Sequence, residues 1–358
     1  MPIVPLYGHD TLRARLLEKS RAGTLPQSLL LHGPPGVGKQ RLALWLGQVL
    51  LCNTGEPCGK CQQCRYTLDL VHPDLTWIFP RPRPRDSDRD ADDVKQDLAE
   101  ATSERVSAGG LYAPPPGSDG IFVATIRFLA RQAALTPALA ARKVFVIGDA
   151  DRMVLQEGSE FAANAVLKLL EEPPRATWVI MTSSAVGSLL STIRSRVVAI
   201  RVPRLNEPAL RAFLGDQAVT SALDKLGLPK SLEKRLILAD GSPGKLLAAG
   251  VRQNVLEEAQ RFLDTATSAR RDDMMRLAFV QGQRGARGAY SDLLDAITVS
   301  LHDRLRRGAQ SGDPRAAATA ARAIDFVEDA KLLADGNVNP QLITAKLLRQ
   351  LAELHRHE

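Results

Sequence analysis

Short apolar runs alternate with helix-period patterns over the first part of the chain. Buried strands are predicted at residues 28–32, 144–147, 178–181 and 197–202. Apolar side chains recur at helical spacing over residues 40–51, and a second amphipathic helix over 161–170 is ended by Pro173 and Pro174. Strands that alternate with helices in this way predict a parallel sheet with right-handed crossovers in an α/β domain.

The strand pattern stops after Pro203, and the rest of the chain is predicted to be helical. Residues 204–250 form a short helical segment, and residues 251–358 form a longer one. In the longer segment Leu293, Ile297, Leu301 and Leu305 follow one another at four-residue spacing. We therefore expect an α/β domain at 1–203, a small helical domain at 204–250 and an all-helical domain at 251–358.

Residues 80–120 interrupt the α/β pattern with an unusual composition. Arg and Pro alternate at 81–85, Asp residues are frequent at 86–93, and residues 109–120 are rich in Gly and Pro. This composition predicts a mobile insertion, with room for one helix at 94–106. The Arg-Pro run is compatible with contact to a DNA backbone, but a solvated loop is the simpler interpretation.

The bulk composition is that of an ordinary water-soluble protein, with 44% hydrophobic and 24% charged residues among 358. Aromatic residues make up only 4%, which argues against a platform that stacks bases. The net charge of +7 is compatible with acidic partners such as nucleic acid and equally with a plain basic surface. The chain shows neither a signal-peptide pattern nor an apolar run of membrane length, so we expect a cytoplasmic protein with reduced cysteines and no membrane partner.

A glycine-rich segment at residues 33–39 has the pattern of a phosphate-binding loop. Gly33, Gly36 and Gly38 precede Lys39, and the segment lies between a predicted strand and a predicted helix. In such loops backbone N–H groups surround phosphate oxygens, the helix N-terminus adds partial positive charge, and the lysine reaches the terminal phosphates. Gln40 departs from the pattern, because a Ser or Thr hydroxyl normally binds Mg²⁺ at this position. The loop predicts the fold, while ATP binding is left open.

The acidic residues that a hydrolysing phosphate-loop enzyme needs are also altered. Such enzymes place Asp and then Glu at the end of a central strand, to hold Mg²⁺ and to orient the attacking water. Here Gly148 takes the first of these positions and Asp149 the second, with Asp151 two residues further on. The carboxylate that would hold the metal is missing.

All four cysteines of the chain lie close together, at Cys52, Cys58, Cys61 and Cys64. In a cytoplasmic protein this spacing suits a tetrahedral Zn²⁺ held by four thiolates. A closed site of this kind has no open position for substrate, so we expect structural zinc. Scattered structural thiols and a redox Cys-x-x-Cys pair are the alternatives.

Together these motifs resemble the clamp-loader subunits of bacterial DNA polymerase III, a branch of the AAA+ family, and the resemblance covers roughly residues 5–250. The segments that carry it are Gly33 to Lys39, the four cysteines, His72-Pro73-Asp74, Lys143 to Asp151, the Leu-Lys-Leu-Leu-Glu-Glu-Pro-Pro run that ends at Pro174, and Ser195-Arg196. The resemblance implies an α/β phosphate-loop domain with a zinc knuckle at 52–64, a helical lid and a helical collar that joins subunits.

Within this family the chain is most similar to the non-hydrolysing delta-prime subunits. The motor subunits keep Ser or Thr after the loop lysine, an Asp-Glu pair and a lid arginine, where this chain has Gln40, Gly148-Asp149 and Gly244. The resemblance assigns Arg196 as an arginine finger that acts in trans on a neighbouring ATPase subunit. Val197 replaces the cysteine that usually follows, which takes no part in the mechanism.

The resemblance also implies partners. They are the gamma/tau motor subunits and a delta subunit in a hetero-pentamer, the sliding clamp, and primer-template DNA within the complex. We expect no catalysis by the isolated chain, which is a component of the polymerase holoenzyme. Two alternatives stay open: an ATP-hydrolysing motor subunit of the gamma/tau type, and a zinc-ribbon protein that binds nucleic acid without ring partners.

Overall fold

The computed structural model describes residues 3–82, 90–113, 119–153, 160–268, 270–282, 289–335 and 338–356. The chain separates into two units, the first formed by Met1–Pro115 with Asp119–Ala249 and the second by Gly250–Glu358. The finer division of the first unit at residue 203 stays a prediction.

The first unit is built on a five-stranded sheet. Its strands are β1 (Ser28–His32), β2 (Leu75–Ile78), β3 (Lys143–Ile147), β4 (Thr177–Ser183) and β5 (Val198–Arg201). The spatial order is β2-β3-β4-β1-β5, and all neighbouring pairs are parallel. The central strands β1, β3 and β4 are almost wholly buried, which explains why their sequences are continuous apolar runs. The predicted parallel α/β sheet is confirmed.

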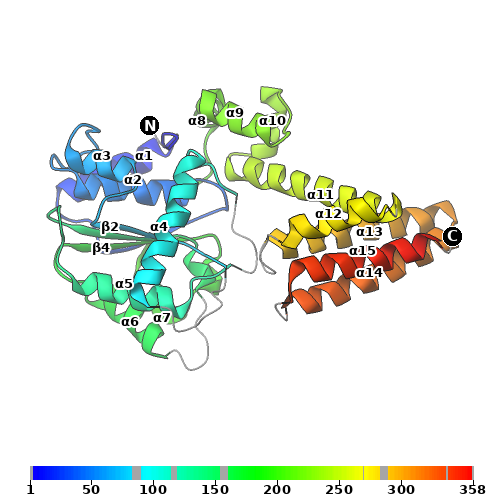
Figure 1. Ribbon diagram of the computed structural model, residues 1–358. Coiled ribbons are helices and arrows are strands. Elements are labelled where there is room, and N and C mark those ends of the chain that lie inside the picture. Colours follow the sequence, from blue (N-terminus) through cyan, green and yellow to red (C-terminus); the bar gives the residue numbers. More distant parts are fainter. Residues whose placement is uncertain are drawn as a thin grey trace. The chain divides into compact units, whose positions relative to one another are not determined.

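Helices cover both faces of this sheet (Figure 1). They are α1 (Asp10–Arg21), α2 (Lys39–Leu51), α3 (Gln62–Leu68), α4 (Ala91–Ser107), α5 (Val123–Ala134), α6 (Glu160–Glu171) and α7 (Ser191–Arg194), with short 3-10 turns at Ala150–Arg152 and Val186–Ser188. Alternate residues of β3 face two separate apolar cores. Phe145 joins the core that includes α5 and α6, and Val146 joins the core that includes α1 and α2.

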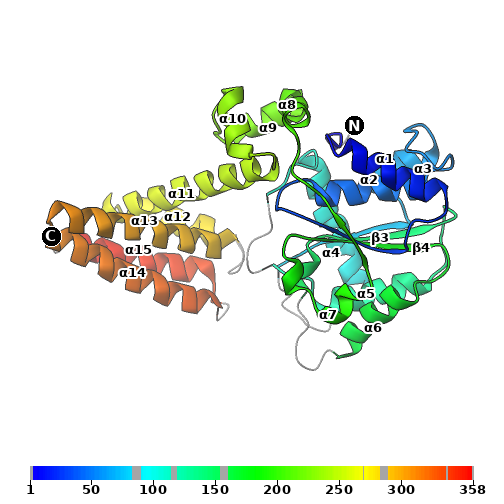
Figure 2. The same cartoon turned by 180° about the vertical axis from the view of Figure 1, so that it is seen from behind.

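The part of the first unit that follows the sheet consists of three short helices and the start of a long one (Figure 2). These are α8 (Glu207–Gly215), α9 (Gln217–Lys225), α10 (Leu232–Ala239) and α11 (Gly244–Ser268), the last of which continues into the second unit. Their apolar side chains form a core of their own, and Val4 from the N-terminal segment is part of it. The beginning of the chain therefore packs against these helices.

The second unit is helical throughout its described residues. Besides the larger part of α11 it contains α12 (Arg271–Gly282), α13 (Ala289–Ser311), α14 (Pro314–Asp335) and α15 (Pro340–Arg356). Of the predicted stripe, Leu293, Ile297 and Leu301 are buried in its core, whereas Leu305 is only partly buried. Within the part of the chain that is described, no helix is long and apolar enough to cross a membrane.

The segment at residues 80–120 contains the helix predicted within the insertion. Residues 83–89 and 114–118 lie outside the described residues, but 90–113 hold helix α4, which extends the predicted helix at both ends. Val94, Leu98 and Ala101 of α4 are buried. The helix predicted within this segment is therefore present, and α4 packs on the sheet through a narrow apolar stripe. The mobile character of the insertion as a whole stays a prediction.

Candidate functional site

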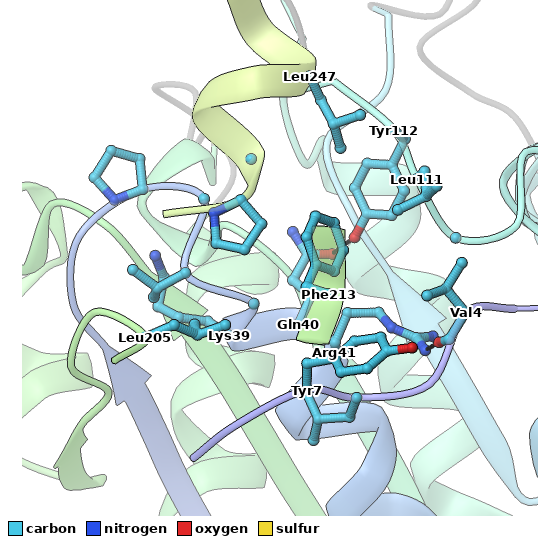
Figure 3. A pocket seen from close by; sticks show the side chains of 18 of the residues that line it. Val4, Tyr7, Lys39, Gln40, Arg41, Leu111, Tyr112, Leu205, Phe213 and Leu247 are labelled. Atoms are coloured by element: carbon cyan, nitrogen blue, oxygen red, sulfur yellow. Dashed lines mark hydrogen bonds between the residues drawn. The ribbon is translucent and has the colours of Figure 1, made fainter. Parts of the chain in front are cut away.

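The glycine-rich loop at residues 33–38 follows the carboxyl end of β1 and leads into α2. This edge of a parallel sheet is where α/β proteins bind ligands, and the N-terminus of a helix favours anions. A cavity of about 270 Å³ lies beside the loop. Its apolar lining includes Val4, Leu6, Tyr7, Leu111, Phe213 and Leu247, most of which are labelled in Figure 3.

The ammonium group of Lys39 is turned onto its own loop. Nζ donates to the carbonyl oxygens of Gly33 and Pro34 at 3.0 and 2.8 Å, and to Ser184 Oγ at 2.8 Å. An ammonium has three N–H donors, so each of them has an acceptor within the chain. Burial lowers the pKa of Lys39, while the nearby carboxylates of Asp149 and Asp151 offset part of that shift.

Gln40 is held by hydrogen bonds at both ends of its side-chain amide. Nε2 donates to Asp149 Oδ2 at 2.9 Å, and Oε1 accepts from Trp77 Nε1 at 3.1 Å and from the Tyr112 hydroxyl at 3.3 Å. Figure 3 shows Tyr112 pointing towards Gln40. Gln40 belongs to α2, and its partners come from β2, the end of β3 and the loop after α4, so the amide joins four parts of the domain.

Gln40 also occupies the space that a side chain at position 148 would need. A Cβ atom built on Gly148 would lie 2.4 Å from Gln40 Oε1 and 2.5 Å from its Cδ, far inside van der Waals contact. The long amide at 40 and the missing side chain at 148 are thus complementary. The two departures noted in the sequence are one structural feature.

Asp149 is the carboxylate that remains at this strand end. Its backbone lies in the left-handed region at φ 48°, and its N–H donates to Thr182 Oγ1 at 3.0 Å. Burial, followed by repulsion from Asp151, raises its pKa. The carboxylate is therefore engaged by the Gln40 amide in a partly buried setting at the wall of the cavity.

Arg105 of α4 also reaches Gln40. Its guanidinium carbon lies 3.4, 4.0 and 4.7 Å from the ring centroids of Phe79, Tyr112 and Trp77. One of its nitrogens, Nη1, lies 3.5 Å from Gln40 Oε1. Burial lowers its pKa. The guanidinium of Arg105 thus lies among three aromatic rings beside Gln40, where cation–π attraction is favourable.

Sequence reasoning did not identify Arg105 or Tyr112 as part of the site. Both lie in the segment predicted to be an insertion, and Arg105 falls within the one helix expected there. A usable signal was present. Val94, Leu98, Ala101 and Arg105 recur at spacings of three and four residues, as on one face of a helix.

The start of α11 presses directly onto the phosphate loop. The Gly244 N–H donates to the Gly36 carbonyl oxygen at 2.9 Å. A Cβ on Gly244 would lie 2.5 Å from the Gly36 Cα, so this contact requires glycine at position 244. The position assigned to a lid arginine in motor subunits is here a backbone contact. Tyr7 adds a second link, because its hydroxyl donates to Asp216 at 2.6 Å.

The four cysteines lie together as predicted, and none forms a disulfide. All four sulfur atoms are within 4.8 Å of one another, and Cys52 Sγ is 3.6 Å from Cys58 Sγ and 3.8 Å from Cys61 Sγ. A tetrahedral metal with metal–sulfur bonds of about 2.3 Å places its ligands about 3.8 Å apart. Backbone N–H groups of Cys61 and Lys60 lower the pKa of Cys58. The cluster therefore has the geometry to hold a metal ion.

The His72-Pro73-Asp74 segment supports the fold around this cluster. His72 Nε2 is hydrogen-bonded to Gln63, the residue before Cys64, and His72 Nδ1 accepts from the Asp74 N–H at 3.0 Å. The buried Asp74 carboxylate accepts three backbone N–H bonds from residues 138–140. Burial by itself would raise the pKa of Asp74, but the three N–H donors lower it by more, so the net pKa is lowered and the group is held ionised. These are structural roles.

Arg196 is not among the residues that line the cavity. It lies just before the edge strand β5, and its side chain is partly exposed. Its Nε donates to Glu171 Oε1 at 2.5 Å, and Nη2 forms an ion pair with the same carboxylate. Nη1 donates to the Thr192 carbonyl oxygen at 2.8 Å and to Ser195 Oγ at 3.2 Å. The loop, Gln40 and Asp149 thus form one site, while the cysteines and Arg196 each lie elsewhere.

A family model described as "DNA polymerase III, delta subunit" matches residues 8–206, more than half of the chain. The DNA polymerase III subunit delta' of Bacillus subtilis is 27% identical over 271 residues, which cover 75% of this chain and 62% of that protein. The corresponding Escherichia coli subunit is 27% identical over 237 residues, with coverage of 65% and 57%.

A DNA polymerase III gamma/tau subunit from Mycobacterium tuberculosis also matches. It is 29% identical over 212 residues, which cover 58% of this chain and 30% of that protein. The chain spans about six tenths of the length of the two delta' relatives.

Proposed function

Because the chain belongs to the family of DNA polymerase III delta subunits, we propose that it is a delta-prime-type subunit of the bacterial clamp loader. It assembles with gamma/tau motor subunits and a delta subunit in a hetero-pentamer, in the cytoplasm. The assembly opens the sliding clamp and loads it onto primed DNA. In this role the chain supports ATP hydrolysis by a neighbour without hydrolysing ATP itself.

The observation that carries the proposal is that the chain fills its own catalytic positions. Lys39 is bonded to loop carbonyls, the Gln40 amide occupies the space beside Gly148, and Gly244 takes the place of a lid arginine. Phosphoryl transfer needs a free lysine, a metal and a positioned water. These departures argue against ATP hydrolysis at this site, while ATP binding is left open.

The gamma/tau alternative rests on the similarity to a gamma/tau subunit over 212 residues. That similarity does not restore the metal ligands, because Gln40 and Gly148 stand where a motor subunit needs a hydroxyl and a carboxylate. ATP turnover by the isolated chain at an ordinary AAA+ rate would favour the motor.

We expect the purified chain to show no ATP hydrolysis above background. We also expect Lys39→Ala to leave the ATPase of the assembled clamp loader unchanged apart from a modest loss of stability, because Nζ makes only internal bonds. The measurement is steady-state ATPase of a complex reconstituted with the motor subunits, with assembly checked by gel filtration. The matched control changes the phosphate-loop lysine of the motor subunit to Ala and must abolish activity. A large loss of ATPase in an intact Lys39→Ala complex would overturn the proposal.

The four-cysteine cluster is proposed to hold one structural Zn²⁺ per chain. Thiolates favour Zn²⁺ over hard cations, and four of them leave no open coordination position. Metal analysis of freshly purified protein, prepared without chelators, is expected to give one zinc per chain. Its removal should increase hydrogen exchange around residues 52–72 while the helical second unit stays protected, because the cluster is local. Absence of zinc, or a disulfide among these cysteines, contradicts the assignment.

Arg196 is proposed to act as an arginine finger for a neighbouring ATPase subunit. Its position supports this role, because it lies on the exposed side and is followed by an edge strand. The nearby apolar residues Leu190 and Val198 are 45% and 49% exposed, as expected of a surface that a partner covers. A guanidinium suits the task because it stays charged and presents a rigid fork of donors to phosphate.

A further inference from the structure

The guanidinium of Arg196 is fully engaged within the chain. Nε and Nη2 face one oxygen of Glu171, and Nη1 bonds to the Thr192 carbonyl oxygen and the Ser195 hydroxyl. All three nitrogens therefore have a partner. A phosphate approaching from a neighbour would find the Nε/Nη2 edge, one of the two edges that bind anions through paired N–H groups, already taken by a carboxylate.

Glu171 is not required by the helix that carries it. It is the last residue of α6, where the partial negative charge of the helix dipole disfavours a carboxylate. Its side chain is 46% exposed, so burial does not explain it either. Its position does bring the carboxylate into contact with Arg196, which lies 25 residues further along the chain.

The pair is also weak enough to open. The Arg196 side chain is 30% exposed, and both partners are in contact with solvent. Exposed ion pairs shift an equilibrium by no more than about fivefold, because water screens them and the side chains lose freedom. A docking neighbour that offers several phosphate oxygens can therefore displace a single carboxylate.

We propose that Glu171 is a latch that parks Arg196 until a neighbouring nucleotide site competes for it. This inference rests on the proposed role of Arg196 as a finger in trans. Carboxylate and phosphate are both anions, and they cannot occupy the same guanidinium edge together. Glu171 thus holds down the basal rate of the neighbour's ATPase, and closure of the assembled complex on DNA transfers Arg196 from Glu171 to the phosphate.

The test is the ATPase of the reconstituted complex with and without primed DNA. Glu171→Gln keeps the size of the side chain and removes its charge, so we expect the DNA-independent rate to rise roughly two- to fivefold. The DNA-stimulated rate should stay near that of the wild type, so that the stimulation ratio falls. Glu171→Asp, which keeps the charge at shorter reach, should be intermediate. The matched control is Glu172→Gln, the exposed neighbouring carboxylate, which should change neither rate.

Two outcomes overturn the latch. One is an unchanged or lowered basal rate in Glu171→Gln with the complex intact, because a merely structural Glu171 would give that result. The other is a raised basal rate that persists in the Glu171→Gln/Arg196→Ala double variant, because the effect would then not pass through Arg196. If Arg196→Ala alone leaves the ATPase unchanged, the finger fails together with the latch. If Glu171→Gln leaves the ATPase rates unchanged while Arg196→Ala lowers them, the latch is wrong but the finger stands.

Discussion

Arg196→Ala is expected to lower the DNA-stimulated ATPase of the assembled clamp loader and its clamp-loading rate, while folding and assembly stay intact. Negative charge develops on the transferred phosphoryl group, and an arginine supplied across a subunit boundary contributes about 10³–10⁵ in rate at the site it serves. The loss in the whole complex will be smaller than that, because in the proposed assembly Arg196 serves only one of the ATPase sites. The measurement is steady-state ATPase and clamp loading on primed DNA.

Two further variants sharpen this experiment. Arg196→Lys should recover only part of the activity, because an ammonium offers a point charge without the planar fork. Arg194→Ala is the matched control, since Arg194 is an exposed arginine two residues away at the end of α7. Normal ATPase and clamp loading in a correctly assembled Arg196→Ala complex would show that Arg196 is not the finger.

Gly148→Asp, which restores the carboxylate of a motor subunit, is expected to destabilise the chain by about 3–5 kcal/mol instead of improving the site. The new Cβ would lie 2.4 Å from Gln40 Oε1. The new carboxylate would also be buried beside Asp149, whose pKa is already raised by its surroundings. Chemical denaturation of the isolated chain gives the free energy of unfolding. Gly187→Asp is the matched control, because Gly187 has open space around it and should change stability by less than about 0.5 kcal/mol.

A double variant tests whether positions 40 and 148 are coupled. Gln40→Ser removes the amide that occupies the space at Gly148, at the cost of leaving Trp77 Nε1 without its acceptor. In the Gln40→Ser/Gly148→Asp double variant the two losses should be less than additive, with a coupling of about 1–3 kcal/mol. Strictly additive losses would mean that the two departures are independent, and the account of a self-filled metal position would be wrong.

The sequence by itself determined the α/β domain and most of its site. Strands β1, β3 and β4 are buried on both faces, so their apolar runs are continuous and easily recognised. The edge strand β2 was missed, because it has only four residues, of which two are partly exposed and two are buried, and so carries little pattern. The loop lysine, the altered Gln40 and Gly148, and the four cysteines could all be read from local spacing, since each depends on neighbours in the chain.

Only the tertiary structure decided what fills the site. Arg105 and Tyr112 contact Gln40 although they lie 65 and 72 positions further along the chain. Gly244 contacts Gly36 across more than 200 residues. Contacts of this kind leave no periodic trace in the sequence, because they depend on how separate elements pack. The same is true of the pairing of Arg196 with Glu171. The sequence therefore named the altered positions, and packing alone established that Gln40 and the missing side chain at Gly148 complement each other.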